Sequence, residues 1–269
     1  MLRNGTDVDL AKTERHLRAN ILGVGVSALN MERALKLCDE HLQGGGRGYV
    51  CVTGVHGIME AQSDAGFRRI QNASLLTTPD GMPTVWLGHL QGHRDMDRVY
   101  GPDFMLEFCR LSVERGYRHY LYGGQPGVAE RLKESLERRF PGITIAGVYA
   151  PPFRPLRPEE EDALRRDLER SKSDILWCGL STPKQERFMA QYVDRLPVKL
   201  MVGVGAAFDI NSGRTADAPQ WVKRMGMQWL HRLLHEPRRL WRRYLYNNPR
   251  FVWLALLQMT GLRRYEFES

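Results

Sequence analysis

The chain has only four cysteines, and their spacing excludes two common kinds of stabilising site. They stand far apart, mostly within predicted strands or helices, at Cys38, Cys51, Cys109 and Cys178. There is no CxxC pair and no His/Cys cluster of the kind that binds zinc. We therefore expect free, buried thiols in a reducing compartment, the cytoplasm, rather than disulfides.

A long hydrophobic run is also missing. Residues 1–17, MLRNGTDVDLAKTERHL, are polar and lack the apolar core of a signal peptide. The apolar stretch FVWLALL, residues 251–257, is far shorter than the roughly 20 residues that a transmembrane helix needs. We expect a flexible N-terminus over residues 1–18, and a chain that can lie on a membrane but does not cross one.

The excess of positive charge is confined to one end of the chain. The net charge is +8, and residues 214–264 hold eleven Lys and Arg against only Asp217 and Glu236. The rest of the chain is therefore close to neutral. A near-neutral body with a basic tail indicates an anionic partner at the tail, such as lipid headgroups, nucleic acid or a phosphorylated ligand.

Short apolar runs alternate with amphipathic stretches through most of the chain. The runs predicted as strands are residues 21–26, 48–55, 119–124, 143–149, 174–180 and 198–205. The stretches predicted as helices include residues 31–42, 104–115, 128–140, 158–170 and 184–195. This alternation is typical of βαβ units. We predict an α/β fold over residues 19–213, with a Rossmann-like, largely parallel sheet and helices on both faces.

Residues 214–269 differ in character and form a predicted helical appendage that is basic and aromatic. Pro219, Pro237 and Pro249 separate it into three predicted short helices. Four of the six tryptophans lie there, at Trp221, Trp229, Trp241 and Trp253. Arginine beside tryptophan on amphipathic helices suits a bilayer interface, and equally suits a helical subdomain that packs its own core.

Polar residues that follow predicted strands are the first candidates for chemistry, because parallel sheets bind ligands at the carboxyl ends of their strands. Asp80, in an Asp-Gly-Met-Pro loop, could accept the proton of an attacking hydroxyl. An Asp before Gly more commonly caps a helix or a turn. Thr53 ends a strand and His56 follows it, and their usual roles are structural.

Three further segments have the composition of nucleotide or sugar contacts. Gly123, Gly124 and Gln125 link a strand to a helix, where glycines let a diphosphate approach the backbone, although a tight turn also uses them. Gly205 and Asp209 belong to half of a dinucleotide-binding fingerprint, in which Asp209 could bind ribose hydroxyls. Gln185, in an ordinary helix start, can both donate to and accept from a sugar.

Acidic triplets that could hold a divalent metal occur in two places. Asp95-Met96-Asp97 follows His-Arg in a polar stretch rather than an apolar strand, which favours a solvated charge run. Asp7-Val8-Asp9 lies in the N-terminal segment. We expect neither a metal nor another cofactor.

Taken together and in order, these segments resemble the WecG/TagA/CpsF glycosyltransferase family over almost the whole chain. The matching motifs are ILGVGVSALNMERAL, DGMPTVW, RVYGPDFM, YLYGGQPGVAE, PGITIAGVYAPPF, DILWCGLSTPKQE, VGVGAAFDINSG and APQWVKRMGMQWLHRLLHEPRRLWRRY. The resemblance implies an inverting, metal-independent transfer of a sugar from a UDP-sugar to a polyprenyl-diphosphate-linked acceptor. The products are cell-surface polymers such as teichoic acid linkage units, enterobacterial common antigen, capsule or exopolysaccharide.

The resemblance also assigns roles by position within a catalytic domain over residues 19–213. Asp80 resembles the catalytic base, and Thr53 and Gln185 resemble the other polar residues of the active cleft. Arg98 and Asp103 resemble a pocket pair near the acceptor or the diphosphate.

The family's nucleotide ribose contact corresponds to Asp209. Its tail attaches the enzyme to the cytoplasmic face of the plasma membrane, where a homo-oligomer exchanges with the monomer. Arginines of that tail also complete the active site, and the corresponding residues here are Arg232, Arg238 and Arg242.

Three positions depart from the commonest family pattern. Val55 stands where the family often has Asn, Asp217 where Arg commonly precedes Ala-Pro, and Gln228 where Glu precedes Trp. The donor sugar is therefore open between N-acetylmannosamine, its uronic acid and glucose. Three other interpretations remain: an NAD-linked oxidoreductase, a basic-tailed nucleic-acid-binding protein, and a membrane-bound scaffold without catalysis. We favour the transferase, with no nucleic acid as partner.

Overall fold

A six-stranded, entirely parallel sheet forms the centre of the molecule in this computed structural model, which describes residues 17–152 and 154–267. The strand order is β4-β3-β8-β7-β5-β6. The strands are β3 (Gly48–Thr53), β4 (Leu76–Pro79), β5 (Arg118–Gly123), β6 (Thr144–Tyr149), β7 (Ile175–Gly179) and β8 (Leu200–Gly203). The predicted α/β, Rossmann-like fold is confirmed.

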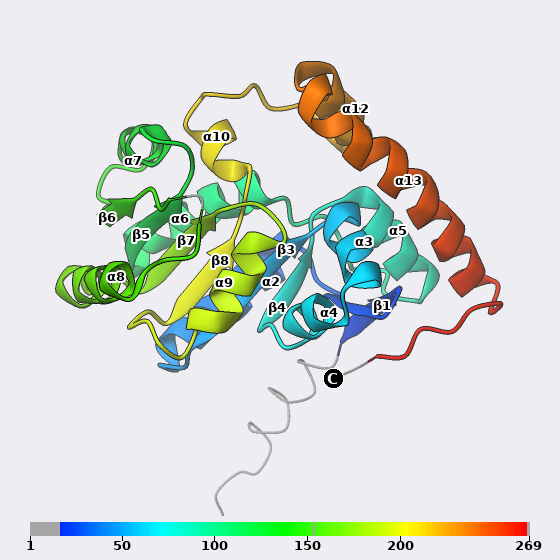
Figure 1. The fold of residues 1–269 in the computed structure, drawn as a ribbon, viewed down its shortest axis with the longest axis horizontal. Helices are drawn as coiled ribbons and strands as arrows, with labels where there is room; N and C mark the ends of the chain where they lie inside the picture. The colour runs from blue at the N-terminus through cyan, green and yellow to red at the C-terminus, as the bar shows by residue number, and fades with distance from the viewer. Residues whose placement is uncertain (1–16, 153, 268–269) are drawn as a thin grey trace, which may run out of the picture.

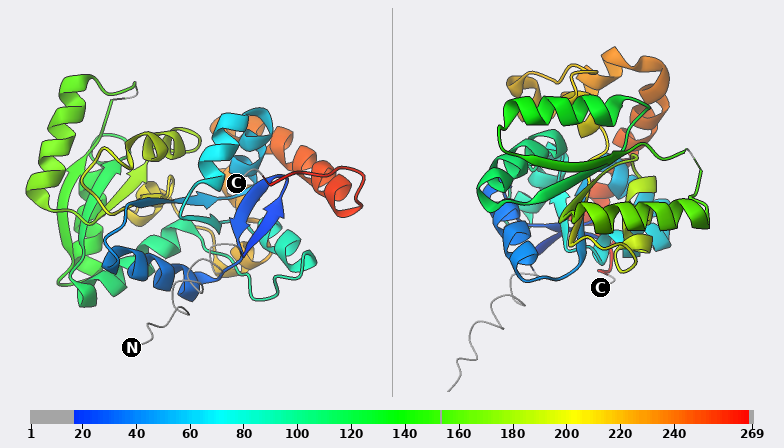
Figure 2. Two further views of the ribbon diagram at one scale, coloured as in Figure 1. Left: turned by 90° about the horizontal axis from the view of Figure 1, so that it is seen from below. Right: turned by 90° about the vertical axis from the view of Figure 1, so that its left-hand side faces the viewer.

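Helices cover both faces of this sheet, as Figures 1 and 2 show. One face carries α2 (Met31–Gln43), α6 (Gly101–Arg115) and α7 (Val128–Arg139). The other carries α4 (Ala65–Asn72), α8 (Pro158–Ser171) and α9 (Lys184–Tyr192). Strands that are buried on both faces are apolar at successive positions, which explains the near-continuous hydrophobic runs in the sequence.

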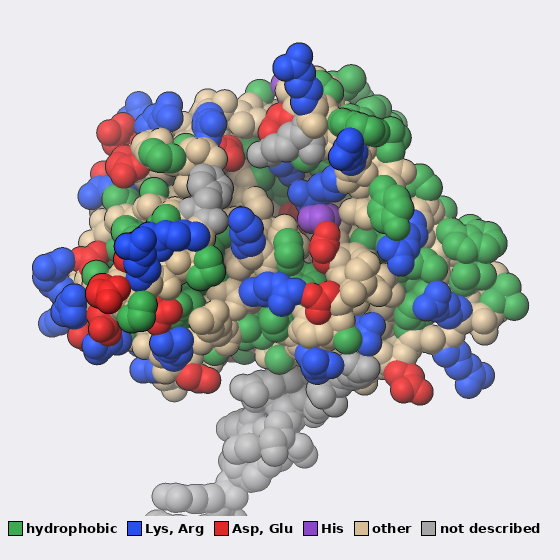
Figure 3. Space-filling model, in the orientation of Figure 1, with side chains coloured by type: hydrophobic (Ala, Val, Ile, Leu, Met, Phe, Trp, Pro, Cys, Tyr) green, Lys and Arg blue, Asp and Glu red, His purple; other side chains and the backbone are tan. Residues whose placement is uncertain are grey.

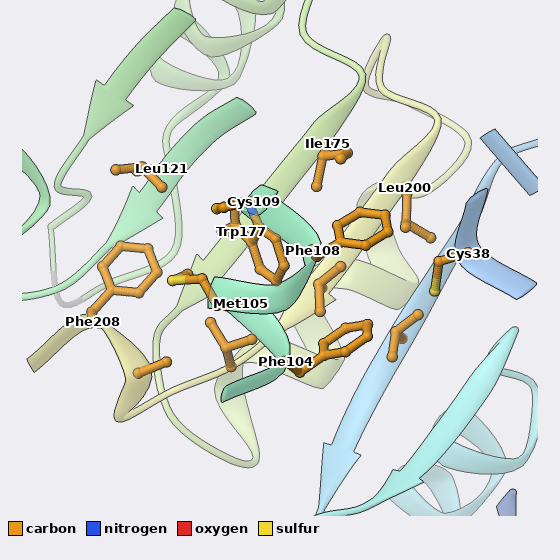
Figure 4. Close-up of a cluster of buried hydrophobic side chains, with 14 of the residues drawn as sticks. Cys38, Phe104, Met105, Phe108, Cys109, Leu121, Ile175, Trp177, Leu200 and Phe208 are labelled. Carbon is orange, nitrogen blue, oxygen red and sulfur yellow. The ribbon is translucent and has the colours of Figure 1, made fainter. Parts of the chain in front are cut away.

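Alternate residues of the central strands enter two different hydrophobic cores. In β7, Ile175 and Trp177 belong to the core beneath α2, α6 and α7, whereas Leu176 and Cys178 belong to the core beneath α8 and α9. Figure 4 shows Trp177 packed among Phe104, Phe108 and Met105 of α6. All four cysteines are buried and free, as predicted.

Residues 21–26, predicted as one strand of the main sheet, instead belong to a separate antiparallel hairpin. Its strands are β1 (Arg18–Ile21) and β2 (Val24–Ser27), and they pair only with each other. The chain reverses at Leu22 and Gly23, both of which have positive φ. The glycine permits this tight turn, so the apolar run folds back on itself and the single-strand prediction is wrong.

The remaining helices lie around the carboxyl end of the sheet and in the appendage. They are α3 (Val55–Ser63), α5 (Met82–Leu90), α10 (Ala207–Asn211), α11 (Gln220–Arg224), α12 (Gln228–His235) and α13 (Pro237–Met259). In Figure 1, α13 runs down the side of the molecule beside α3 and α5. No helix among the described residues is both long and apolar enough to cross a bilayer.

The predicted helix break at Pro249 is wrong, because Pro249 lies inside α13. Proline removes one helical hydrogen bond and strains the preceding turn. Leu240 lies before the proline and Phe251 and Leu254 after it, and all three are buried. Packing on both sides of the proline therefore keeps the helix continuous.

The end of the chain returns to the N-terminal hairpin. The Asn20 side chain donates to the Tyr265 carbonyl at 2.8 Å, and the Gln258 amide bonds the backbone of both Asn20 and Leu22. The appendage is thus fixed to the body at its far end. Residues 1–16, which hold Asp7-Val8-Asp9 and nearly all of the predicted flexible segment, lie outside the described residues.

Candidate active site

A cavity of about 1050 Å³ lies at the carboxyl ends of β3, β4, β7 and β8. After β4 the chain crosses to the other half of the sheet, and open parallel sheets bind ligands beside such a reversal of strand order. The sheet side of the cavity contributes His56, Asp80, Gln185, Gly205 and Asp209. Helix α5 and the appendage form the opposite wall.

Asp80 is positioned by the ends of two neighbouring strands. It follows β4 directly, and its backbone N–H donates to the Thr53 carbonyl at the end of β3 at 3.1 Å. Its Oδ1 accepts from the Gly101 N–H at 3.0 Å. Within the described residues, Oδ2 has no hydrogen-bond partner, and the nearby Gly54 leaves the space beside it open. This oxygen can accept a proton from a bound hydroxyl.

Arg98 joins the Asp80 loop to the appendage. Its Nε donates to the Asp80 carbonyl at 2.6 Å, and its Nη2 donates to Gln228 at the start of α12. The guanidinium also lies over the Tyr100 ring, 4.2 Å from the ring centroid. These contacts fix a positive charge beside the carboxylate, where it can neutralise a bound phosphate.

A second polar cluster holds α11 against α6. Lys223 is buried, and its Nζ lies 2.5 Å from Asp217 Oδ2 and 3.6 Å from Asp103 Oδ1. Tyr100 donates its hydroxyl proton to Asp217 Oδ1 at 2.9 Å. Burial raises the pKa of Asp103, while Lys223 acts in the opposite direction. Asp217, which departs from the family pattern, is therefore the internal counter-ion of a buried lysine.

His56 lies on the cavity wall near the N-terminus of α3 as a neutral group. Burial, and to a smaller extent the positive charge of Arg243, lowers the pKa of its imidazole to about 3. Its Nδ1 lies 3.3 Å from the side-chain nitrogen of Asn247 on α13. At neutral pH this imidazole can exchange hydrogen bonds with a ligand but contributes no positive charge.

Two helix N-termini also reach the cavity. Gly54 is the N-cap of α3 and makes no side-chain capping bond, and Ser181 and Thr182 precede α9. The first N–H groups of a helix lack partners within it, and the helix dipole places partial positive charge there. Such ends bind phosphate groups.

The structure places several predicted residues away from the cavity. Thr53 is buried, and its hydroxyl accepts from the Gln71 amide at 3.3 Å. Gly123 ends β5, and Gly124 and Gln125 follow it. Strand β7 separates β5 from β8, and none of the three residues lines the cavity. At Gly123, an added Cβ would come within 2.8 Å of the Gly179 backbone, so close packing of strands already explains this glycine.

The three predicted arginines of the appendage separate into two groups. Arg232 on α12 lines the cavity, whereas Arg238 and Arg242 on α13 are exposed and do not. Arg243 lines it instead and was missed. The sequence spacing could have identified Arg243. It lies three positions from Leu240, four from Asn247 and eight from Phe251, so all four share one face of a helix.

Asp209 and Gly205 line the cavity, and Asp209 lies in the short helix α10 and accepts from Arg214 at 3.1 Å. Asp103 does not line it but contacts Lys223, which does. Sequence reasoning also missed Lys223 and Asn247, because their positions depend on how the appendage docks.

The described residues contain no group of three or more His, Cys, Asp or Glu side chains that could hold a metal ion. Asp95 and Asp97 are exposed, and Asp97 Oδ1 accepts from the Arg98 N–H at 2.6 Å. The titratable and charged groups on the cavity wall are the carboxylates of Asp80 and Asp209, the imidazole of His56, and the cations Arg98, Lys223, Arg232 and Arg243.

Sequence comparison decides which family this site belongs to. The model of the family described as Glycosyl transferase WecG/TagA/CpsF matches residues 19–265. The chain belongs to this family. It is therefore a glycosyltransferase, a hexosyltransferase of cell-envelope polysaccharide biosynthesis, and the resemblance seen in its motifs is confirmed.

Two relatives of the WecG/TagA/CpsF family come from Bacillus, and both are named as N-acetylglucosaminyldiphosphoundecaprenol N-acetyl-beta-D-mannosaminyltransferase. The protein from Bacillus spizizenii (strain W23) is 31% identical over 207 residues, which cover 74% of this chain and 78% of the relative. The protein from Bacillus subtilis (strain 168) is 28% identical over 185 residues, which cover 69% of this chain and 70% of the relative.

Proposed function

We propose that the chain is an inverting, metal-independent transferase that moves a hexose from a UDP-sugar to a polyprenyl-diphosphate-linked acceptor. One observation carries the proposal: of the two carboxylates on the cavity wall, Asp209 pairs with Arg214, whereas Asp80 keeps an oxygen without a hydrogen-bond partner among the described residues. The acceptor hydroxyl attacks the anomeric carbon while the bond from that carbon to UDP breaks. The proton of the acceptor hydroxyl passes to Asp80, and UDP leaves with the electron pair of the broken bond.

Cationic side chains and helix ends stabilise the leaving diphosphate in this scheme. Arg98, Arg232 and Arg243 line the cavity together with the N-termini of α3 and α9. Fixed charges and N–H groups that face developing negative charge are strong contributors to catalysis, and they act here in place of a metal. Positioning the two substrates contributes about 7 kcal/mol or more toward the barrier.

The acceptor's lipid chain leaves the cavity between α5 and α13. On this side the lining is apolar, with Trp86 and Leu90 from α5 and Val252, Leu256 and Met259 from α13. These side chains are partly exposed, and Figure 3 shows hydrophobic side chains gathered along α13. The relatives' acceptor is named as a diphosphoundecaprenol. An apolar exit beside a cationic interior suits a ligand of that chemistry.

The membrane partner of the appendage is part of the same proposal. Trp241, Leu245, Tyr246 and Trp253 of α13 are exposed, and basic residues accompany them. Aromatic side chains at headgroup depth and arginines at phosphates hold such a helix on an anionic surface. The enzyme then acts on the cytoplasmic face of the plasma membrane, with its cavity mouth toward the lipid.

The donor sugar is proposed as N-acetylmannosamine, its uronic acid or glucose. The relatives' names support the first, and Val55 on the cavity wall, where the family often has Asn, keeps the other two open. A product assay with each UDP-sugar and a short polyprenyl-diphosphate acceptor separates the three.

Isothermal titration with UDP tests the proposal most directly. Binding in EDTA that is unchanged by excess magnesium is the expected result, because the cavity supplies cationic side chains. Binding that requires magnesium would contradict the metal-independent scheme. Absence of binding in both buffers, repeated on anionic liposomes, would contradict the transferase mechanism as drawn.

A further inference from the structure

Glu186, the third residue of α9, is a fully buried carboxyl beside the cavity that the mechanism above does not use. Its Oε1 accepts from the Thr182 hydroxyl at 2.7 Å and from the Gln185 side-chain Nε2 at 3.1 Å. Its Oε2 has no hydrogen-bond partner among the described residues. Burying a carboxyl is expensive, so a chain that retains one this close to its active site has a use for it.

The bond to Glu186 determines which way the Gln185 amide faces. At this contact Glu186 Oε1 is the acceptor, so the NH₂ group points to it and the carbonyl points away. The carbonyl oxygen of Gln185 is buried without a hydrogen-bond partner among the described residues. Gln185 lines the cavity, so this oxygen is an acceptor that the protein leaves for a ligand.

Two glycines leave space around this amide. A Cβ at Gly203 would lie 3.1 Å from Gln185 Nε2 and 2.7 Å from Met189. A Cβ at Gly205 would lie 3.5 Å from Gln185 Oε1, and Gly205 also has a positive φ. A side chain at Gly203 would press on the amide and on Met189, whereas one at Gly205 would be opposed by the positive φ, so the end of β8 leaves room for the amide.

The pKa of Glu186 stays raised, and its Oε1 accepts from Gln185 whether or not Oε2 carries a proton. Burial raises the pKa of the carboxyl, and hydrogen bonds from Thr182 and Gln185 together with the charge of Arg243 oppose that rise. The adjacent Cys51 and Cys178 are buried thiols whose pKa values lie far above neutrality, so they bring no negative charge.

We infer that Glu186 is a positioning residue that holds the Gln185 carbonyl toward the cavity, where it accepts a hydrogen bond from a hydroxyl group of the transferred sugar. This role rests on the proposed function, because the ligand is the sugar of the UDP-sugar donor. Glu186 acts only through Gln185 and touches no substrate.

A double-mutant cycle measures this coupling. Glu186→Gln replaces the carboxylate with an amide that can face either way, and Gln185→Met removes the carbonyl at similar size. We expect E186Q to raise the KM for the donor about tenfold with a smaller change in kcat, and to change KM less than twofold in the Q185M background. Equal effects in both backgrounds, or no effect in either, would overturn the inference. Glu130→Gln, an exposed first-turn glutamate of α7, is the matched control.

Nuclear magnetic resonance gives a readout that does not depend on activity. The Gln185 side-chain NH₂ signal, identified by its loss in Q185M, should be shifted downfield and protected from solvent exchange in the wild type. E186Q and Glu186→Leu should both move it toward the range of ordinary amides while retaining the melting temperature within a few degrees. If the chemical shift and exchange rate of the Gln185 NH₂ group are the same in both variants as in the wild type, the positioning role is overturned. If the NH₂ signal shifts in both variants but the wild type has no activity with any UDP-sugar, the positioning role stands and only the proposed function is refuted.

Discussion

At the residue scale, the role of Asp80 depends on one free carboxylate oxygen. Asp80→Asn keeps an oxygen for the Gly101 N–H but cannot take a proton from the acceptor. We expect turnover to fall by roughly 10²- to 10⁴-fold, the usual contribution of a general base, with UDP affinity unchanged. Initial rates and UDP titration check this, and the exposed Asp95→Asn is the control. Near-normal turnover of a folded D80N protein would remove Asp80 from the mechanism.

A second residue-scale prediction concerns the buried His119. Its Nδ1 accepts from the Trp177 indole at 2.8 Å, and burial lowers the pKa of the imidazole to about 4. An unfolded histidine titrates near 6.5, so between about pH 4 and 6.5 the unfolded chain binds more protons. This contribution to stability is therefore complete above pH 6.5 and is lost as pH falls toward 4.

Urea unfolding at pH 7.5 and pH 5 measures the effect. The linkage predicts a loss of about 2 kcal/mol attributable to His119 over this interval. The free energy of unfolding should differ between pH 7.5 and pH 5 by about 2 kcal/mol less in His119→Gln than in the wild type. In His235→Gln, which alters an exposed histidine of α12, this difference should equal that of the wild type. Equal pH dependence in all three proteins would show that His119 does not titrate on unfolding.

Individual site residues could be predicted where a local rule applied. Asp80 and Gln185 were found because they follow strands of a parallel sheet, and both line the cavity. Glu186 could not be predicted as a site residue, since only the docking of α9 on the sheet shows that it is buried. Arg243 was missed because the family resemblance pointed to its neighbour Arg242.

At the scale of elements, helix α13 presents one face to the cavity and another to solvent. Arg243 lies on the inner face, near His56 and Glu186. Arg243→Ala should weaken UDP binding about tenfold or more, because charge-assisted hydrogen bonds to phosphate contribute about 1.5–3 kcal/mol. Arg224→Ala, at an exposed position of α11, should change it less than twofold. Calorimetry checks both, and equal affinities would exclude Arg243 from the diphosphate site.

The outer face of α13 supports a different prediction. Trp241 and Trp253 are 46% and 61% exposed and do not line the cavity. Replacing both with Glu should lower binding to vesicles of anionic lipid by more than tenfold and leave turnover of a water-soluble acceptor unchanged. Vesicle sedimentation at low and high salt measures the first quantity. Undiminished sedimentation would mean that another surface contacts the membrane.

Elements could be predicted when their sequence pattern was local. Predictions were wrong where a tight turn or tertiary packing overrode that pattern. Helices α2, α6, α7, α8 and α9 lie within a few residues of their predicted bounds, since each shows a helical period in its own sequence. The hairpin and the unbroken α13 were mispredicted for opposite reasons. A glycine turn divided one apolar run, whereas buried contacts on both sides of Pro249 joined two predicted helices.

At the scale of the whole molecule, the order of the strands in the sheet could not be predicted from the sequence. The last strand, β8, lies between β3 and β7, so the cavity is assembled from chain segments far apart in sequence. Alternation of strands and helices predicts a parallel sheet but not which strands are neighbours. The appendage's docking, and with it Lys223, Asn247 and Gln228 in the cavity wall, depends on the same long-range contacts.

The return of the chain to its first hairpin also orders events during synthesis. The hydrogen bond from Asn20 to Tyr265 joins residues 245 positions apart, and the Phe267 ring covers Gly25 so closely that no side chain would fit there. The hairpin therefore leaves the ribosome long before its final partners are made. The parallel sheet can form during translation, since its last strand ends at Gly203, but the cavity wall closes only after nearly all of the described chain has emerged. A nascent chain stalled before α13 would hold a folded sheet and an unfinished active site.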